Sequence, residues 1–180
     1  MTVQTLTDTA PANTTADPYV QPLLIQLGAN SFAFHRNVDG VTHAESLRAP
    51  GEHGNCLNWV VGHVVATRQA WLAQVLGQPT VIDGARLAIY KRGSAPLADG
   101  VDVVPLEELV AAFDAAQGPL VQAMSRLTAE RLAQPAPFSP VDDPQETLGS
   151  LVAKLAFHEG YHIGQTGVLR RLLGHAGGIA

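Results

Sequence analysis

Two histidines four residues apart, His158 and His162, are the side chains whose type and spacing most strongly suggest chemistry. On an α-helix, positions i and i+4 lie on one face, so both imidazoles come within reach of a single metal ion. With Glu159 between them, they also fit the pattern H-E-x-x-H of zinc proteases, in which the glutamate is the general base. The spacing therefore predicts a helix that carries two metal ligands.

The residues that follow this pair do not support a protease. In the long protease signature a third histidine comes six residues after the second, and Val168 stands at that position here. No Asp or Glu follows Glu159 to serve as a downstream ligand. His175 lies beyond a helix stop at Gly174, where we expect a solvated tail residue. Because no strand is predicted that could align a peptide, we expect a metal site of another kind.

A third histidine, His63, lies on a mostly apolar segment between Trp59 and Thr67. His158 and His162 continue the stripe of leucines on their own helix, so all three are expected to face the interior. A single buried histidine is usually an ordinary core residue, because an unpartnered buried polar group costs about 1–3 kcal/mol. Three inward-facing histidines favour a shared metal ion. Three imidazoles leave coordination positions for water or substrate, as in catalytic sites, and they suit Zn, Ni, Fe or Cu.

Three other side chains could take part, and a fourth is a less suitable candidate. Glu159 is a candidate general base toward an activated water, although a solvent-facing or outer carboxylate is the simpler interpretation. Gln165 either lines the site or makes an ordinary hydrogen bond between helices. Arg92 could bind a substrate carboxylate or could be a solvated loop arginine. Cys56 is two turns from the third histidine, too far to act as a ligand beside it, and we expect a core thiol.

The elements that must position these residues are four predicted helices, each with apolar residues at helical spacing. Asn55 is the expected N-cap of the second helix. Asp143, Pro144 and Glu146 mark the start of the fourth as N-cap, N1 and N3. Gly118-Pro119 predicts a kink or break in the third. The predicted helices cover residues 19–37, 55–76, 106–132 and 144–173, with a short helical turn at 44–47 and a long loop at 78–104.

Composition restricts the class of protein. The chain has 180 residues, of which 46% are hydrophobic and 15% charged, a composition typical of one globular domain. A net charge of −5 without a Lys/Arg cluster argues against nucleic-acid binding. No apolar run reaches the ~18 residues that a membrane span needs, and a single cysteine excludes an intrachain disulfide. We expect an all-α four-helix bundle over residues 19–176, preceded by a flexible arm over residues 1–18. The arm has no signal-peptide features, so we expect the protein in the cytoplasm.

Three stretches of the chain resemble the DinB/YfiT-like family of metal-dependent enzymes. They are Gly54 to His63 with the following Arg68, Tyr90 to Ser94, and Phe157 to Gln165. The resemblance implies an up-down-down-up four-helix bundle, often dimeric, that binds a divalent metal through His63, His158 and His162. Mycothiol-dependent isomerases of the family commonly have a glutamate where His158 stands, so this chain departs from that branch.

Some members of this family transfer low-molecular-weight thiols such as bacillithiol or mycothiol, and others act as isomerases or hydrolases. The resemblance and the three histidines together favour a metal-dependent S-transferase with a low-molecular-weight thiol as cosubstrate and a small-molecule substrate. A metal-dependent hydrolase and a non-catalytic metal-binding protein are the alternatives. The resemblance also implies a homodimer.

Overall fold

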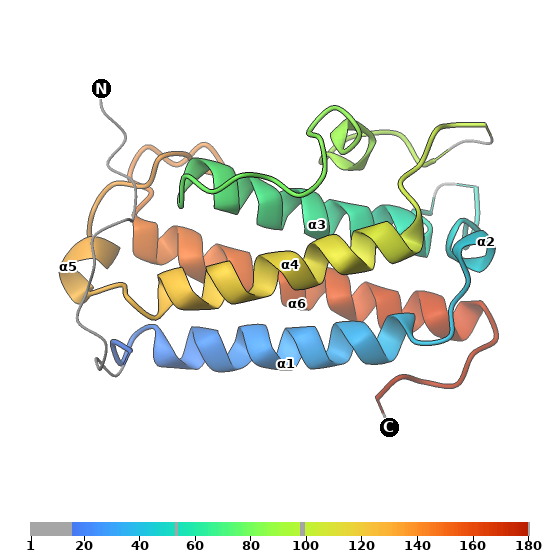
Figure 1. Ribbon diagram of the computed structural model, residues 1–180, viewed down its shortest axis with the longest axis horizontal. Helices are drawn as coiled ribbons and strands as arrows, with labels where there is room; N and C mark the ends of the chain where they lie inside the picture. Colours follow the sequence, from blue (N-terminus) through green and yellow to red (C-terminus); the bar gives the residue numbers. More distant parts are fainter. Residues whose placement is uncertain (1–15, 53, 98–99, 180) are drawn as a thin grey trace.

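Four long helices lie side by side along the molecule (Figure 1). The computed structural model describes residues 16–52, 54–97 and 100–179. Within these ranges the helices are α1 (Gln21–Val38), α2 (His43–Ser46), α3 (Leu57–Gln74), the 3-10 helix η1 (Ala88–Tyr90), α4 (Leu106–Met124), α5 (Ala129–Leu132) and α6 (Leu148–Leu172). The same residues form no strand beyond an isolated bridge between Pro135 and Thr147. The predicted all-α class is therefore confirmed.

The start of α6 lies four residues after the predicted start at Pro144. Its N-cap is Thr147, whose hydroxyl accepts a hydrogen bond from the backbone N–H of Ser150 at 3.2 Å. The Ser150 hydroxyl in turn accepts one from the Thr147 N–H at 3.0 Å. This capping box satisfies two N–H groups that the helix leaves unpaired. The predicted box with Glu146 at N3 is wrong, because that carboxylate instead accepts a hydrogen bond from the Ser150 hydroxyl.

Two other predicted boundaries also move. α4 continues through Gly118-Pro119 and ends at Met124, so the break in this region falls after the proline, at residues 125–128. Pro119 lies on the exposed side of α4, where the carbonyl that loses its helical partner faces solvent. The N-cap of α3 is Cys56, without a side-chain cap hydrogen bond, and not the predicted Asn55.

Two hydrophobic clusters fill the bundle, one in each half along its length. Phe34, Val61 and Phe113 belong to the first cluster, and Leu27 and Leu120 belong to the second. Full burial of one such side chain stabilises the fold by about 1.5–3 kcal/mol. α3 is buried nearly all round, as its sequence predicted, so it is the central element against which the other helices pack.

α1 contacts the backbone of α6 through side-chain amides. The Asn30 amide donates a hydrogen bond to the Ala156 carbonyl at 3.3 Å, and the Asn37 amide donates one to the Ile163 carbonyl at 3.0 Å. Because the later residue of α1 pairs with the later residue of α6, the two helices run parallel. A Cβ atom at Gly167 would lie 3.2 Å from the Asn37 amide nitrogen, so a glycine there lets the amide approach.

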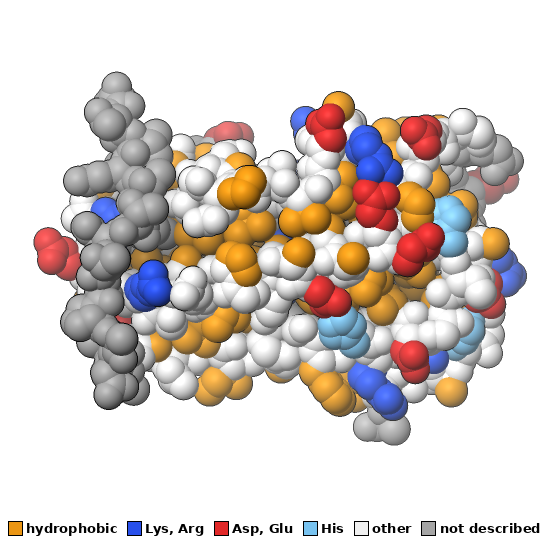
Figure 2. Space-filling view, viewed as in Figure 1, with side chains coloured by type: hydrophobic (Ala, Val, Ile, Leu, Met, Phe, Trp, Pro, Cys, Tyr) orange, Lys and Arg blue, Asp and Glu red, His pale blue; other side chains and the backbone are white. Residues whose placement is uncertain are grey.

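Charged side chains of both signs lie together on the face drawn in Figure 2, mostly over the half of the molecule near α2. Because the signs are mixed, that face has no basic patch of the kind that binds phosphate. In the part of the chain that the structure describes, no helix is both long and apolar enough to cross a membrane. The predicted arm lies largely in residues 1–15, outside the described residues, and the domain limits and the cytoplasmic location stay predictions.

Candidate metal centre

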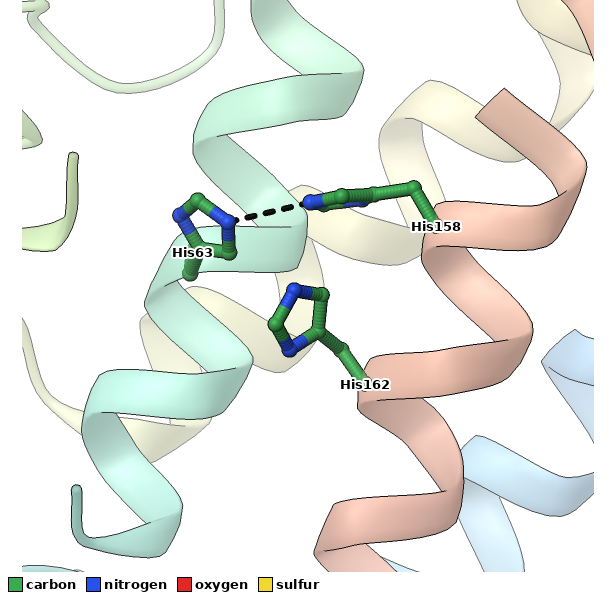
Figure 3. A group of neighbouring side chains, drawn as sticks. All are labelled: His63, His158 and His162. Atoms are coloured by element: carbon green, nitrogen blue, oxygen red, sulfur yellow. Dashed lines mark hydrogen bonds between the residues drawn. The ribbon is translucent and has the colours of Figure 1, made fainter. Parts of the chain in front are cut away.

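Three imidazoles, His63 from α3 and His158 and His162 from α6, point into the space between the two helices (Figure 3). One ring nitrogen from each lies within 4.8 Å of the other two, and Nε2 of His63 lies 3.0 Å from Nε2 of His158. Nitrogen ligands of a tetrahedral zinc ion lie about 3.3 Å apart. The structure thus brings together the three histidines that the sequence singled out, at separations close to those of a metal site.

Two of the rings are held with Nε2 free to act as a ligand. Nδ1 of His63 lies 2.7 Å from the backbone carbonyl of Tyr90, and Nδ1 of His162 lies 2.7 Å from Oε1 of Gln165. Because both oxygens are acceptors, each Nδ1 carries the proton and each Nε2 keeps its lone pair. Metal-binding histidines characteristically donate their second N–H to such an acceptor. Gln165 therefore contacts a candidate ligand of its own helix and does not bridge two helices.

His158 completes the set but lacks this support. Its Nδ1 is buried and has no hydrogen-bond partner among the described residues. In the absence of a cation, its Nε2 must carry a proton toward Nε2 of His63, because two lone pairs cannot face each other at 3.0 Å. That arrangement leaves Nδ1 of His158 as a buried, bare acceptor. A cation held by the three Nε2 atoms would relieve the close approach of two lone pairs, so the donor set fits a divalent metal ion. Nδ1 of His158 would then carry the proton, still without a partner among the described residues.

Burial and mutual repulsion keep the three imidazoles neutral. Desolvation, with smaller contributions from the nearby His162 and His63, lowers the pKa of His158 to about 3. Desolvation is also the main cause that lowers the pKa of His63, against the hydrogen bond to the Tyr90 carbonyl. The pKa of His162 is lowered by desolvation, although its hydrogen bond to Gln165 opposes the shift. Neutral imidazole is the form that binds metal.

The position of His63 depends on the segment around η1. A Cβ atom on Gly62 would lie 2.3 Å from the Tyr90 ring, so only glycine lets that ring rest against α3. The Tyr90 hydroxyl donates to Oδ1 of Asn58 at 2.9 Å and fixes the ring from its other end. The indole of Trp59 stacks on the His63 imidazole, with ring centroids 5.0 Å apart. Trp59 is thus a wall of the site.

Glu159 lies next to His158 in sequence but is fully buried, so its solvent-facing interpretation is wrong. Oε1 and Oε2 accept hydrogen bonds from Nε and Nη2 of Arg68 at 2.6 and 3.0 Å. The remaining Nη1 of Arg68 donates to the Phe113 carbonyl at 2.9 Å, and the guanidinium carbon lies 3.5 Å from the centre of the Phe113 ring. Both carboxylate oxygens are therefore engaged in an ion pair that joins α3 to α6.

The other candidates lie apart from the histidines or are buried as expected. Arg92 is exposed, and its Nη1 donates to the Pro140 carbonyl at 3.1 Å, so it links two loops. Cys56 is buried, as predicted for a core thiol, and desolvation raises its pKa. The Tyr90 carbonyl and the pairing of Arg68 with Glu159 were not expected, because a backbone acceptor and a partner 91 residues away leave no pattern in the sequence.

The comparison with protein families agrees with this geometry. Residues 28–166 match the model of the DinB superfamily, which covers most of the chain and all three histidines. The chain therefore belongs to the DinB superfamily. No curated protein matches it.

Proposed function

We propose that His63, His158 and His162 hold a divalent transition metal ion, with Zn, Ni and Fe as the candidate ions. The observation that carries this proposal is the convergence of three ring nitrogens within 4.8 Å, on imidazoles whose pKa values are lowered. Two of the rings already have the outer hydrogen bonds that metal ligands use. Three neutral ligands without a carboxylate or thiolate leave the positive charge of the ion available to a substrate.

We further propose that the protein is an enzyme that transfers a low-molecular-weight thiol to a small-molecule electrophile. A bound divalent ion supplies a positive charge that lowers the pKa of a thiol beside it. His158 and His162 are only partly buried, so a small thiol can reach the site from solvent. In the transfer, sulfur bonds to the electrophilic carbon, the leaving group departs with the bonding electrons, and the thiol proton passes to solvent.

Hydrolysis is the competing activity, and the position of Glu159 argues against it. A base beside the attacking water would assist a hydrolase, yet both oxygens of this carboxylate accept hydrogen bonds from Arg68 in a fully buried pair. No other Asp or Glu among the described residues belongs to the histidine cluster. A thiol deprotonates far more readily than water, so a thiol transferase can work without such a base.

The experiment begins with untagged protein, because an affinity tag of histidines would itself bind metal. Metal content by mass spectrometry should approach one ion per chain, and His63→Ala should lose it. Metal-loaded protein is then tested with a panel of cellular thiols and electrophiles for conjugate formation. Turnover of esters or amides without added thiol would instead show a hydrolase, and bound metal without any turnover would show a non-catalytic metal protein.

We also propose that the protein is a homodimer that uses the outward face of α6. Four large apolar side chains on this face, Phe157, Tyr161, Val168 and Leu172, are 56–69% exposed. Their spacing is symmetric about the midpoint of Gly164 and Gln165, so an antiparallel second copy places Phe157 opposite Leu172 and Tyr161 opposite Val168. Gly164, where an added Cβ would meet no atom within 4 Å, leaves room for close approach. A two-fold interface requires this self-complementarity.

A further inference from the structure

The ion pair between Arg68 and Glu159 is the most deeply buried charged group in the described part of the chain that the proposed chemistry does not use. Both side chains are 0% exposed. Along each helix the pair lies between the two hydrophobic clusters: Val65 and Trp71 flank Arg68 on α3, and Leu155 and Ile163 flank Glu159 on α6. A buried ion pair thus separates the two apolar clusters.

Stability alone is a weak explanation for such a pair. Desolvating two charges offsets most of their attraction, and buried ion pairs replaced by well-packed apolar side chains are often equally or more stable. The best-attested role of buried polar groups is to fix the register of helices that could otherwise slide. Apolar packing is not directional, so the two clusters on either side of this pair do not by themselves fix the register of the helices. A hydrogen-bonded ion pair is directional and can do so.

The geometry of the pair is suited to fixing register. A guanidinium that binds both oxygens of a carboxylate restricts sliding and rotation together, because its N–H groups form a rigid planar fork. Nη1 also binds the Phe113 carbonyl, which fixes the Arg68 side chain against α4. Glu159 directly follows His158 on α6, and Arg68 lies five residues after His63 on α3. The fork therefore sits beside the point where the imidazoles of α3 and α6 meet.

Small displacements matter at this point. A slide of α6 by one residue moves it about 1.5 Å along its axis, whereas metal–ligand distances must hold within about 0.2 Å. The hydrogen bonds to Tyr90 and Gln165 orient the rings of His63 and His162, but neither hydrogen bond joins α3 to α6. Besides the contact between His63 and His158 itself, the ion pair is a direct side-chain connection between these two helices next to the site.

We propose that Arg68 and Glu159 are positioning residues of the metal centre: their buried fork sets the register of α3 against α6 in which the three imidazoles converge. This inference rests on the proposed metal site. Neither residue contacts the imidazoles through a hydrogen bond in the structure, so both act through the backbone of their helices. Glu159 thus has a role distinct from that of a general base.

The test replaces both charges by apolar side chains, in the double variant Arg68→Met with Glu159→Leu. Zinc affinity is measured by competition with a chromogenic chelator, and Co²⁺ replaces zinc so that its visible absorption spectrum reports ligand geometry. We expect affinity to fall roughly 10- to 100-fold, as for other outer partners of metal ligands, with an altered cobalt spectrum. The Tm of the metal-free double variant should stay level or rise.

The matched control is the exposed pair of Arg86 and Glu108, which also makes two parallel hydrogen bonds at 2.5 and 2.9 Å. Arg86→Met with Glu108→Leu should leave zinc affinity and the cobalt spectrum unchanged. Wild-type affinity and spectrum in the folded Arg68/Glu159 double variant would overturn the inference while the metal site stands. Absence of metal binding by the wild type would instead overturn the proposed site itself.

A second variant keeps the test decisive if the double variant does not fold. Glu159→Asp keeps the counter-charge of Arg68 but withdraws the carboxylate by one methylene, so it perturbs the helix register without leaving a buried unpaired charge. We expect a several-fold loss of zinc affinity and a shifted cobalt spectrum in the folded protein. An unchanged affinity in this variant would count against a positioning role, because a purely structural contact would alter Tm alone.

Discussion

The backbone carbonyl of Tyr90 lies 2.7 Å from Nδ1 of His63, while the ring of the same tyrosine rests against Gly62. The residue before the candidate ligand therefore controls the acceptor that orients it. A Cβ at Gly62 would lie 2.3 Å from the Tyr90 ring, too close for any real contact. The ring would have to move, and the carbonyl of Tyr90 would move with it.

We expect Gly62→Ala to weaken metal binding and to destabilise the fold by about 1–3 kcal/mol, the usual effect of overpacking a core. Urea denaturation of the metal-free protein gives the second quantity, and chelator competition gives the first. Gly28→Ala on α1 is the control, because a Cβ there meets nothing within 4 Å. That variant should be neutral or stabilised by up to about 1 kcal/mol. Equal metal affinity and equal stability of the two variants would contradict the proposed role of Tyr90.

Gln165→Ala should lower zinc affinity roughly 10-fold, because it removes the acceptor that orients His162 through Nδ1. Gln165→Glu should retain or raise the affinity, since a carboxylate is a stronger acceptor at the same place. The comparison is made by chelator competition at pH 7. If alanine and glutamate have the same effect, the hydrogen bond does not support the ligand.

Acid should destabilise the metal-free protein through its histidines. The pKa of His158 is about 3 in the folded protein and about 6.5 when unfolded. Between these values the unfolded chain binds a proton that the folded chain does not, so the free energy of unfolding falls as pH decreases. For this residue alone the loss is about 2 kcal/mol between pH 6.5 and pH 5.

Denaturation curves at pH 5, 6 and 7 in the presence of a chelator measure this loss. His158→Gln removes the titrating group, so its stability should depend less steeply on pH over the same interval. A variant with the wild-type pH dependence would show that His158 is not buried in its neutral form. His63 and His162, whose pKa values are also lowered, should contribute in the same direction.

Val168→Glu should convert the proposed dimer into a monomer, because it places two negative charges within an interface whose pairing is symmetric. The matched control is Val81→Glu in the loop between α3 and α4. Val81 is 54% exposed and Val168 is 56% exposed, so the two substitutions cost the monomer about the same. Sedimentation velocity distinguishes the species. A monomeric wild type, or a dimeric Val168→Glu variant, would rule out this interface.

The three histidines could be found from the sequence because each carries its own signal. His158 and His162 share one face of one helix by spacing alone, and His63 interrupts an apolar segment. Glu159 could not be interpreted in the same way. Its position on the helix is compatible with a general base, a solvated side chain or an outer carboxylate. The pairing with Arg68, which lies 91 residues away in the sequence, decides between these interpretations.

Helix types were predicted more reliably than helix ends. Two overlapping start signals precede α6, one at Asp143-Pro144 and one at Thr147, and both satisfy the same local rules. The structure uses the second, where Thr147 and Ser150 cap each other. At Pro119 the local rule predicted an interruption, but the exposed position of that residue and the burial of neighbouring side chains such as Leu120 allow α4 to continue.

The amides of Asn30 and Asn37 bind carbonyl oxygens of α6, and the Asn37 amide also donates to the Thr166 hydroxyl at 3.1 Å. A backbone carbonyl is present whatever residue occupies the position, so these contacts constrain the sequence of α6 at two places: at Gly167, where bulk would block the amide, and at Thr166, whose hydroxyl accepts a hydrogen bond. His158 and His162 take no part in these hydrogen bonds, so replacing either imidazole leaves the attachment of α6 to α1 intact. The helix that carries two of the three imidazoles is therefore anchored to α1 by residues other than the candidate ligands.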